Sequence, residues 1–227
     1  GILVEPIMGV GGFITPPDEY FKIVAEIVRN YGGVFISDEV QTGFGRTGKR
    51  WGIEHYGVEP DMITVAKGIA NGMPLAAVVT TQEIASTLTK NTISTFGGSP
   101  VSCAAANATI DIIERDNLKD NSAKMGKILR DGLEGLKEKF PKVIGEVRGK
   151  GLMQGMELVK DETAGDRTPN VAAADQLMEE TKKRGLFIGR GGLYGNSMRI
   201  SPPLVITKAE VEEAVGIMDD SFKAMDV

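Results

Sequence analysis

The sequence predicts an α/β protein in which a mostly parallel sheet with helices is followed by a smaller C-terminal α+β domain. Residues 2–40 read as a strand, a helix and a second strand, which is the order that builds parallel sheets. Glycine provides 29 of the 227 residues and falls in short loops between apolar runs. Such loops are typical of places where the backbone turns tightly or approaches a ligand. After Pro141 the pattern changes to alternating, glycine-broken segments.

The first predicted domain covers residues 1–117. The apolar run "ILVEPI" predicts its first strand. A helix follows, because prolines and acidic residues precede an apolar face with helical spacing and two glycines end it. The expected elements are a strand, a helix, three further strands and an apolar helix, at 2–7, 15–33, 34–40, 62–67, 76–81 and 101–116.

A polar helix over 118–139 is expected to link this domain to the second one, at 140–227. Gly185 is a candidate C-cap of a helix in the second domain. Thr207 and Glu210 fit a capping box at the start of the last helix. The expected elements are a twisted hairpin, a helix, two short strands and the closing helix, at 143–159, 171–185, 186–191, 197–204 and from Thr207.

Composition excludes several classes of function. A net charge of −5 argues against a broad nucleic-acid surface. Cys103 is the only cysteine, so no intrachain disulfide forms, which suits a reducing compartment. His55 is the only histidine, which leaves little for a Ser-His-Asp triad or a histidine metal site, and we expect no metal. No apolar run approaches the ~20 residues of a membrane span. We expect no membrane partner and a cytoplasmic location, with the mitochondrial matrix as the alternative for a eukaryotic source.

Two charged residues stand at the ends of predicted strands. Asp38, together with Glu39, lies at the carboxyl end of the strand at 34–40, and Lys67 ends the strand at 62–67. Ligands of open α/β sheets bind beyond the carboxyl ends of the strands, where these side chains would converge. A lysine with a lowered pKa is a nucleophile for Schiff-base chemistry. The local pattern also allows a lysine that snorkels to solvent and an aspartate that caps a loop.

Two glycine-rich stretches are candidate phosphate loops. "GFGRTG" at 43–48 matches a dinucleotide fingerprint literally, but no helical pattern follows, so we expect it to shape the rim of a site instead. "STFGGSP" at 94–100 places the hydroxyls of Ser94 and Thr95 and the backbone of two glycines just before a predicted helix. This arrangement suits a phosphate, and simple helix capping is the alternative.

Arg199 and Glu5 are charges within otherwise apolar runs. A guanidinium in that setting needs a carboxylate partner or an anionic ligand. The pair therefore predicts one of two arrangements. Either Arg199 and Glu5 form a structural salt bridge, or Arg199 binds a substrate carboxylate and Glu5 controls access to it.

Six segments, taken together, resemble a known family. They are "ILVEPIMGVGG", "VFISDEVQTGFGRTG", "PDMITVAKGIANGMPLAAV", "NTISTFGGSPVSCAA", "VRGKGLMQGMEL" and "MRISPPLVIT". In order and spacing they are similar to the class III pyridoxal-phosphate aminotransferases, above all the alanine–glyoxylate and ω-amino-acid members. The resemblance implies the fold type I of PLP-dependent transferases, with residues 1–117 as the C-terminal portion of the large, PLP-binding domain.

The resemblance also implies roles for the residues around PLP. Lys67 would form the Schiff base and then shuttle a proton, and Asp38 would pair with the protonated pyridine nitrogen. Val40 would pack on the ring, and Gln41 would hydrogen-bond its 3′-oxygen. Thr95 would reach the phosphate of the neighbouring subunit's PLP, which makes the protein a homodimer with shared active sites.

For the substrate, the resemblance implies that Arg199 binds a carboxylate and that Glu5 pairs with Arg199 when it must move aside. The implied reaction moves an amino group from an amino acid or ω-amino acid to a small 2-oxo acid, pyruvate or glyoxylate. The alternatives are an aminomutase, a dialkylglycine-type decarboxylase, or an inactive fragment that acts only in assembly.

The chain begins "GILVEPI" without an initiator methionine, and we expect it to be a segment of a longer chain. The similar region forms about the second half of the family chain. The other half supplies the main phosphate loop and the aromatic residue that stacks on PLP, and no segment here matches either. We therefore expect the segment alone to bind PLP weakly.

Overall fold

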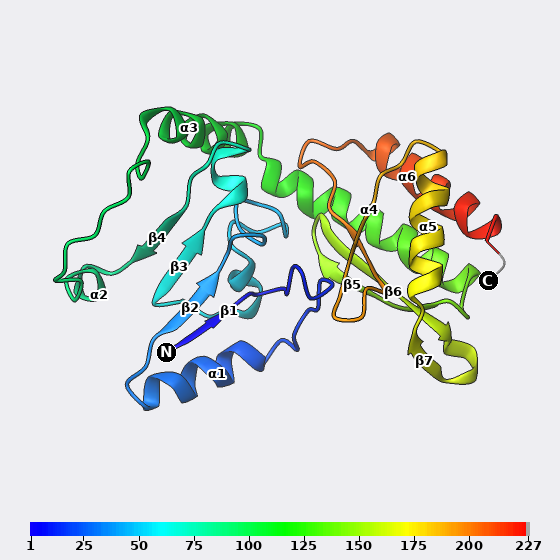
Figure 1. Cartoon of the computed structure of the whole chain (residues 1–227), viewed down its shortest axis with the longest axis horizontal. Coiled ribbons are helices and arrows are strands. Elements are labelled where there is room, and N and C mark those ends of the chain that lie inside the picture. Colours follow the sequence, from blue (N-terminus) through cyan, green and yellow to red (C-terminus); the bar gives the residue numbers. More distant parts are fainter. Residues whose placement is uncertain (226–227) are drawn as a thin grey trace. The chain divides into compact units, whose positions relative to one another are not determined.

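A computed structural model describes residues 1–225, and the chain divides into two compact units (Figure 1). The first unit holds residues 1–6 and 16–119, and the second holds residues 7–15 and the chain from 120 onward. The boundaries at 117 and 139 that the sequence suggested stay a prediction. The sequence did not indicate that the loop 7–15 packs with the second unit.

A four-stranded sheet forms the centre of the first unit. Its strands lie in the order β1 (Ile2–Val4), β2 (Phe35–Asp38), β3 (Met62–Val65) and β4 (Ala77–Thr80) (Figure 1). The first three are parallel and β4 is antiparallel to β3. The expected α/β class is confirmed, and the carboxyl ends of β1, β2 and β3 lie along one edge of the sheet.

Helix α1 (Tyr20–Asn30) packs beside this sheet and buries Phe21 and Ala25. The ring of Phe21 lies edge-to-face with that of Tyr56, with centroids 4.6 Å apart, a geometry that adds about 0.5–1.5 kcal/mol to burial alone. The other helical elements of the unit are η1 (Gly52–Tyr56), η2 (Lys67–Ala70), α2 (Gln82–Ala85) and α3 (Pro100–Arg115). The turns of 43–48 are followed by the short 3₁₀ helix η1, not by the α-helix that a dinucleotide fingerprint requires.

Helix α4 (Leu118–Lys139) has the bounds that the sequence predicted and continues from the first unit into the second. The second unit contains an antiparallel sheet in the order β5 (Ile144–Lys150), β6 (Met153–Asp161), β9 (Ser197–Ile200) and β8 (Gly189–Gly191). The short strand β7 (Asp166–Pro169) pairs with β6 and follows the 3₁₀ helix η3 (Glu162–Ala164).

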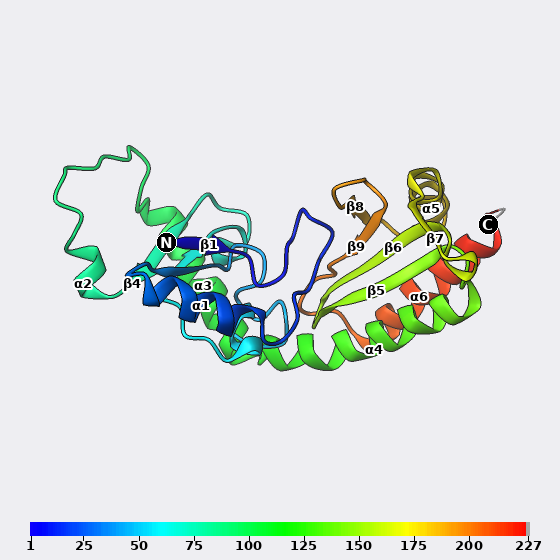
Figure 2. The same cartoon turned by 90° about the horizontal axis from the view of Figure 1, so that it is seen from below.

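One face of this sheet is covered by α4, α5 (Val171–Lys183) and α6 (Lys208–Lys223) (Figure 2). The core between them includes Leu133, Met156, Leu177, Met198 and Met218, all fully buried. The predicted capping box is present at the start of α6. Because side chains alternate along β9, Met198 and Ile200 enter this core, while Ser197 and Arg199 project from the other face. In the described part of the chain, no helix combines the length and apolar character needed to span a lipid bilayer.

Helix α4 approaches the turn between β5 and β6 closely at Gly126. A Cβ atom at this position would lie 2.3 Å from the backbone of Gly151, whereas a Cβ at Gly135, on the same helix, would meet nothing within 4 Å. We expect Gly126→Ala to lower the free energy of unfolding by about 1–3 kcal/mol, because backbone cannot move aside as a side chain can. Urea unfolding measures this change. The matched Gly135→Ala variant should instead gain about 0.4–1 kcal/mol, and equal effects of the two changes would contradict this packing.

Candidate active site

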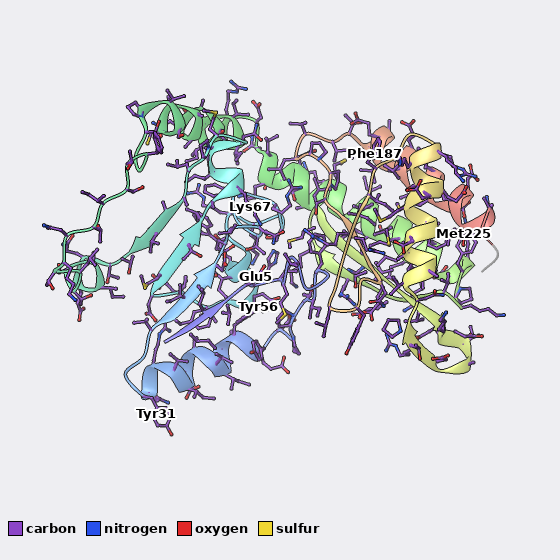
Figure 3. The ribbon with its side chains drawn as sticks, viewed as in Figure 1. Glu5, Tyr31, Tyr56, Lys67, Phe187 and Met225 are labelled. Carbon is purple, nitrogen blue, oxygen red and sulfur yellow. The ribbon has the colours of Figure 1, made fainter. Side chains whose placement is uncertain are left out.

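Three of the candidate residues lie at or just beyond the carboxyl ends of the parallel strands of the first unit. Val4 lies opposite Ser37 and Asp38 opposite Thr64, so Glu5 is level with Asp38 on the neighbouring strand. The Glu39 N–H continues the pairing to the Thr64 carbonyl at 2.9 Å, and Lys67 comes three residues after Thr64. Neighbouring strands lie about 4.8 Å apart, so these side chains share one edge of the sheet. Figure 3 labels Glu5 and Lys67 at this edge.

Lys67 has an unusual backbone conformation. Its φ of +45° is in the left-handed region, which costs a residue other than glycine about 1–3 kcal/mol. The buried side chains of Ile69 and Ala70, which follow in η2, anchor the turn. The Lys67 side chain is exposed in this chain, so burial does not separate it from the other lysines. Its position just beyond β3 and its left-handed backbone conformation mark it as a candidate site residue.

Asp38 holds the turn that follows β2. Its Oδ1 accepts a hydrogen bond from the Val40 N–H at 3.0 Å, which is the loop-capping role that the sequence left open. A carboxylate has two oxygens, so this bond is compatible with a second role. Val40 and Gln41 come next and are half-buried.

Glu39 is a site-shaping residue to which the sequence assigned no role. Its carboxylate is fully buried and accepts four hydrogen bonds. Oε1 accepts the Ser37 hydroxyl at 3.0 Å and the Ile53 N–H at 2.9 Å. Oε2 accepts the Thr42 hydroxyl at 2.5 Å and the Gly52 N–H at 2.8 Å. A buried charge needs such complete pairing, and here the pairing fastens the turn after β2 to η1.

Tyr56 fixes the chain just beyond Glu5. Its buried hydroxyl donates to the Pro6 carbonyl at 3.0 Å. Burial, with a smaller contribution from Asp18, raises the pKa of Tyr56 to about 12, so the hydroxyl keeps its proton and stays a donor at neutral pH.

Thr95 lies outside the strands of the first unit. It is exposed and belongs to the long segment between α2 and α3, which stands away from the sheet (Figure 1). The N-cap of α3 is Ser99, whose side chain makes no capping bond, and Pro100 begins the helix. The structure therefore gives no support to Ser94 or Thr95 as simple helix caps.

Arg199 lies in the second unit, in the middle of β9, with its guanidinium 5.0 Å from the centre of the Phe13 ring. Glu5 belongs to the first unit, so the pairing of Glu5 with Arg199 stays a prediction.

Comparison with known proteins bears on what these residues do. The family model "Aminotransferase class-III" matches residues 1–222. The chain belongs to this family. It is 46% identical to alanine–glyoxylate aminotransferase 2 homolog 2, mitochondrial, of Arabidopsis thaliana over 99% of this chain and 47% of that protein. It spans about half the length of the curated relatives it matches.

Solved structures agree with this assignment. The chain matches an amine transaminase from an uncultivated Pseudomonas species, solved in a PLP-bound form, with a TM-score of 0.89 and 37% identity. The match covers 98% of this chain and 51% of that one. An Arthrobacter phospholyase, solved with phosphoethanolamine, matches with a TM-score of 0.92 and 36% identity over 98% and 53%. The expected fold type I and the family resemblance are confirmed.

Glu39 gives a test of the site's framework. In Glu39→Gln the amide N–H₂ faces a backbone N–H, of Gly52 or of Ile53, whichever way the amide is turned, so at least one buried group loses its partner. We expect this substitution to lower the free energy of unfolding, measured by urea unfolding, by about 1–3 kcal/mol. Glu59→Gln removes an exposed carboxylate of the same unit and should change stability by no more than about 0.5 kcal/mol. Equal stability of the two variants would contradict the role given to Glu39.

Proposed function

We propose that this chain is part of a PLP-dependent aminotransferase that moves an amino group from an amino acid or ω-amino acid to a small 2-oxo acid, pyruvate or glyoxylate. The observation that carries this proposal is the placement of Asp38 at the end of β2 and of Lys67 just beyond the adjacent parallel strand β3, in a chain of the class III family. An aspartate for the pyridinium and a lysine for the aldehyde carbon are the protein groups that PLP requires.

The residues of this edge fit those requirements. The turn after β2 is held by Asp38 itself and by the four bonds of Glu39, so the Asp38 carboxylate has a fixed position. The Lys67 amine stands on a flexible four-carbon stem and is accessible in this chain. A Cβ at Gly68 or Gly72 would meet nothing within 4 Å, so the surroundings of Lys67 are open.

Each side chain has a defined task in the proposal. When bound, PLP supplies an electron sink that stabilises negative charge at the carbon next to the substrate nitrogen. Asp38 would accept a hydrogen bond from the pyridinium N–H, Val40 would pack against the ring, and Gln41 would donate to the 3′-oxygen. The Lys67 amine would bind the aldehyde carbon of PLP. Once displaced by the substrate amine, it would take a proton from the substrate carbon bonded to nitrogen and return it to the former aldehyde carbon on the other side of that nitrogen.

In the same proposal Arg199 binds the substrate carboxylate, and Glu5 pairs with Arg199 when a different substrate requires it to move. An arginine fork matches a carboxylate with two parallel hydrogen bonds, which favours a reaction on amino and oxo acids. This preference argues against the aminomutase alternative. The decarboxylase alternative also has a carboxylate-bearing substrate, so amino-donor profiling of the complete chain separates it from transamination.

A homodimer with shared active sites is part of the proposal, because Thr95 would reach the phosphate in the neighbouring subunit. The apolar side chains near Thr95 support this proposal, because a second subunit would cover them. Ile93 is 98% exposed and Phe96 is 85% exposed in this chain. We also propose a cytoplasmic or mitochondrial-matrix location, which agrees with the single, unpaired Cys103.

Transamination by the complete natural chain, loaded with PLP, tests this function. With L-alanine and glyoxylate as probes, we expect pyruvate and glycine to form. Lys67→Ala should lower the rate by at least about 100-fold, because the proton shuttle is lost. Lys124→Ala removes an exposed lysine of α4 and should leave the rate unchanged. Equal rates for the two variants would contradict the proposal.

A further inference from the structure

The strand neighbours of Arg199 are unusually small. Across β9, Arg199 lies opposite Gly155 of β6 on one side and opposite Gly189 of β8 on the other. Gly191, two residues further along β8, also lies beside its side chain. The Arg199 side chain therefore has space on the β6 side and beside Gly191, and what fills this space decides its conformation.

Phe13 fills the space on the β6 side. Its ring is 1% exposed and lies under the Arg199 guanidinium. Gly155 makes room for it: a Cβ atom at this position would lie 3.2 Å from the Phe13 Cβ and 3.1 Å from the Gly12 carbonyl oxygen. The aromatic ring therefore occupies a socket that a larger residue on β6 would partly fill.

The loop 7–15 that carries Phe13 is fastened to the second unit. The Phe13 N–H donates to the Met8 carbonyl at 2.9 Å, and the Gly192 N–H donates to the Val10 carbonyl at 3.0 Å. Nε of the buried Arg148 donates to the Gly12 carbonyl at 3.0 Å. Phe13 has a φ of +59°, a left-handed conformation that these bonds maintain.

Arg148 is itself held in place. Its guanidinium donates to the carboxylates of Glu146 and Glu157 and to the Ser197 hydroxyl. Burial by itself raises the pKa of Glu157, but the hydrogen bond and charge of Arg148 outweigh it, so this pKa lies below its ordinary value. Glu157 therefore stays charged at neutral pH and keeps Arg148 directed at the loop.

Gly191 borders Arg199 on the β8 side. A Cβ atom at this position would lie 2.5 Å from the Arg199 Cδ, which no real structure tolerates, so the arginine stem would have to move. A Cβ at Gly189, on the same strand, would come no closer than 3.5 Å to Arg199, an ordinary contact.

We propose that Phe13 and Gly191 are positioning residues that hold Arg199 ready for a carboxylate and so set the enzyme's preference for carboxylate-bearing substrates. This inference rests on the proposed function, in which Arg199 binds the carboxylate. The ring covers one face of the guanidinium, whereas a carboxylate bonds to the N–H groups at its edge, so both contacts exist together. Holding the side chain before the substrate arrives reduces the entropy that binding loses.

Two carbonyl reagents measure this preference without knowledge of the natural substrate. Aminooxyacetate carries a carboxylate, and O-methylhydroxylamine does not; both convert PLP to an oxime and remove its visible absorbance. The quantity measured on the PLP-loaded complete chain is the ratio of their second-order rate constants. We expect Phe13→Leu and Gly191→Ala each to lower this ratio about 3- to 10-fold, through aminooxyacetate alone.

The controls match each change. Phe222→Leu removes an equally buried ring of the second unit that stacks on Phe140, and Gly189→Ala adds a methyl group to the same strand. Both should keep the ratio of the unmodified protein. Melting temperatures of all variants report any loss of folding, and Gly191→Ala keeps the test decisive if Phe13→Leu does not fold.

The rate-constant ratio of Arg199→Gln distinguishes a failure of the positioning role from a failure of the proposed function. If this variant leaves the ratio unchanged, Arg199 does not bind the carboxylate and the proposed function loses that assignment. If it lowers the ratio at least about 10-fold while Phe13→Leu and Gly191→Ala do not, the positioning role is overturned. Equal slowing of both reagents by these two variants would also overturn it, because that result shows general damage to the PLP site.

Discussion

Parallel pairing of β1, β2 and β3 is the constraint on which the site depends. It places the residues at and beyond the carboxyl end of each strand along one edge, so that Glu5, Asp38 and Lys67 share this edge although 62 positions separate the first from the last. A ligand at this edge faces groups from three strands, each anchored by the same sheet. The chemistry proposed for PLP therefore follows from the register of the sheet as much as from the residues themselves.

In each unit, a buried ionisable side chain holds a turn or loop beside a candidate site residue. Glu39 fastens the turn after β2 next to Asp38, and Arg148 fastens the loop that carries Phe13 beneath Arg199. Buried ions are costly to desolvate, and apolar residues often stabilise a core as well. Their contribution here is to fix the conformation of the loops. The partners of each carboxylate or guanidinium come from different segments, and all the hydrogen bonds form together only when these segments keep their observed arrangement.

The sequence could predict what depends on local pattern. The position of Asp38 at the end of β2, the bounds of α4 and the capping box at Thr207 all follow from apolar periodicity and from residues a few positions apart. The strand predicted to end at Lys67 ends instead at Val65, because the chain turns into η2 at Lys67. It could not predict the contact of Phe13 with Arg199, because loops and strands 186 positions apart meet only through the packed sheet. The four hydrogen bonds of Glu39 could not be predicted from the sequence for the same reason, since two of the donors lie 13 and 14 positions away.

The most direct measurement for the whole account is chemical mapping of the lysine that binds PLP. The complete chain is loaded with PLP and reduced with sodium borohydride, and its peptides are sequenced by mass spectrometry. The account predicts a phosphopyridoxyl group on Lys67. A label on another lysine, or no label on a protein that shows the visible absorbance of bound PLP, would contradict it.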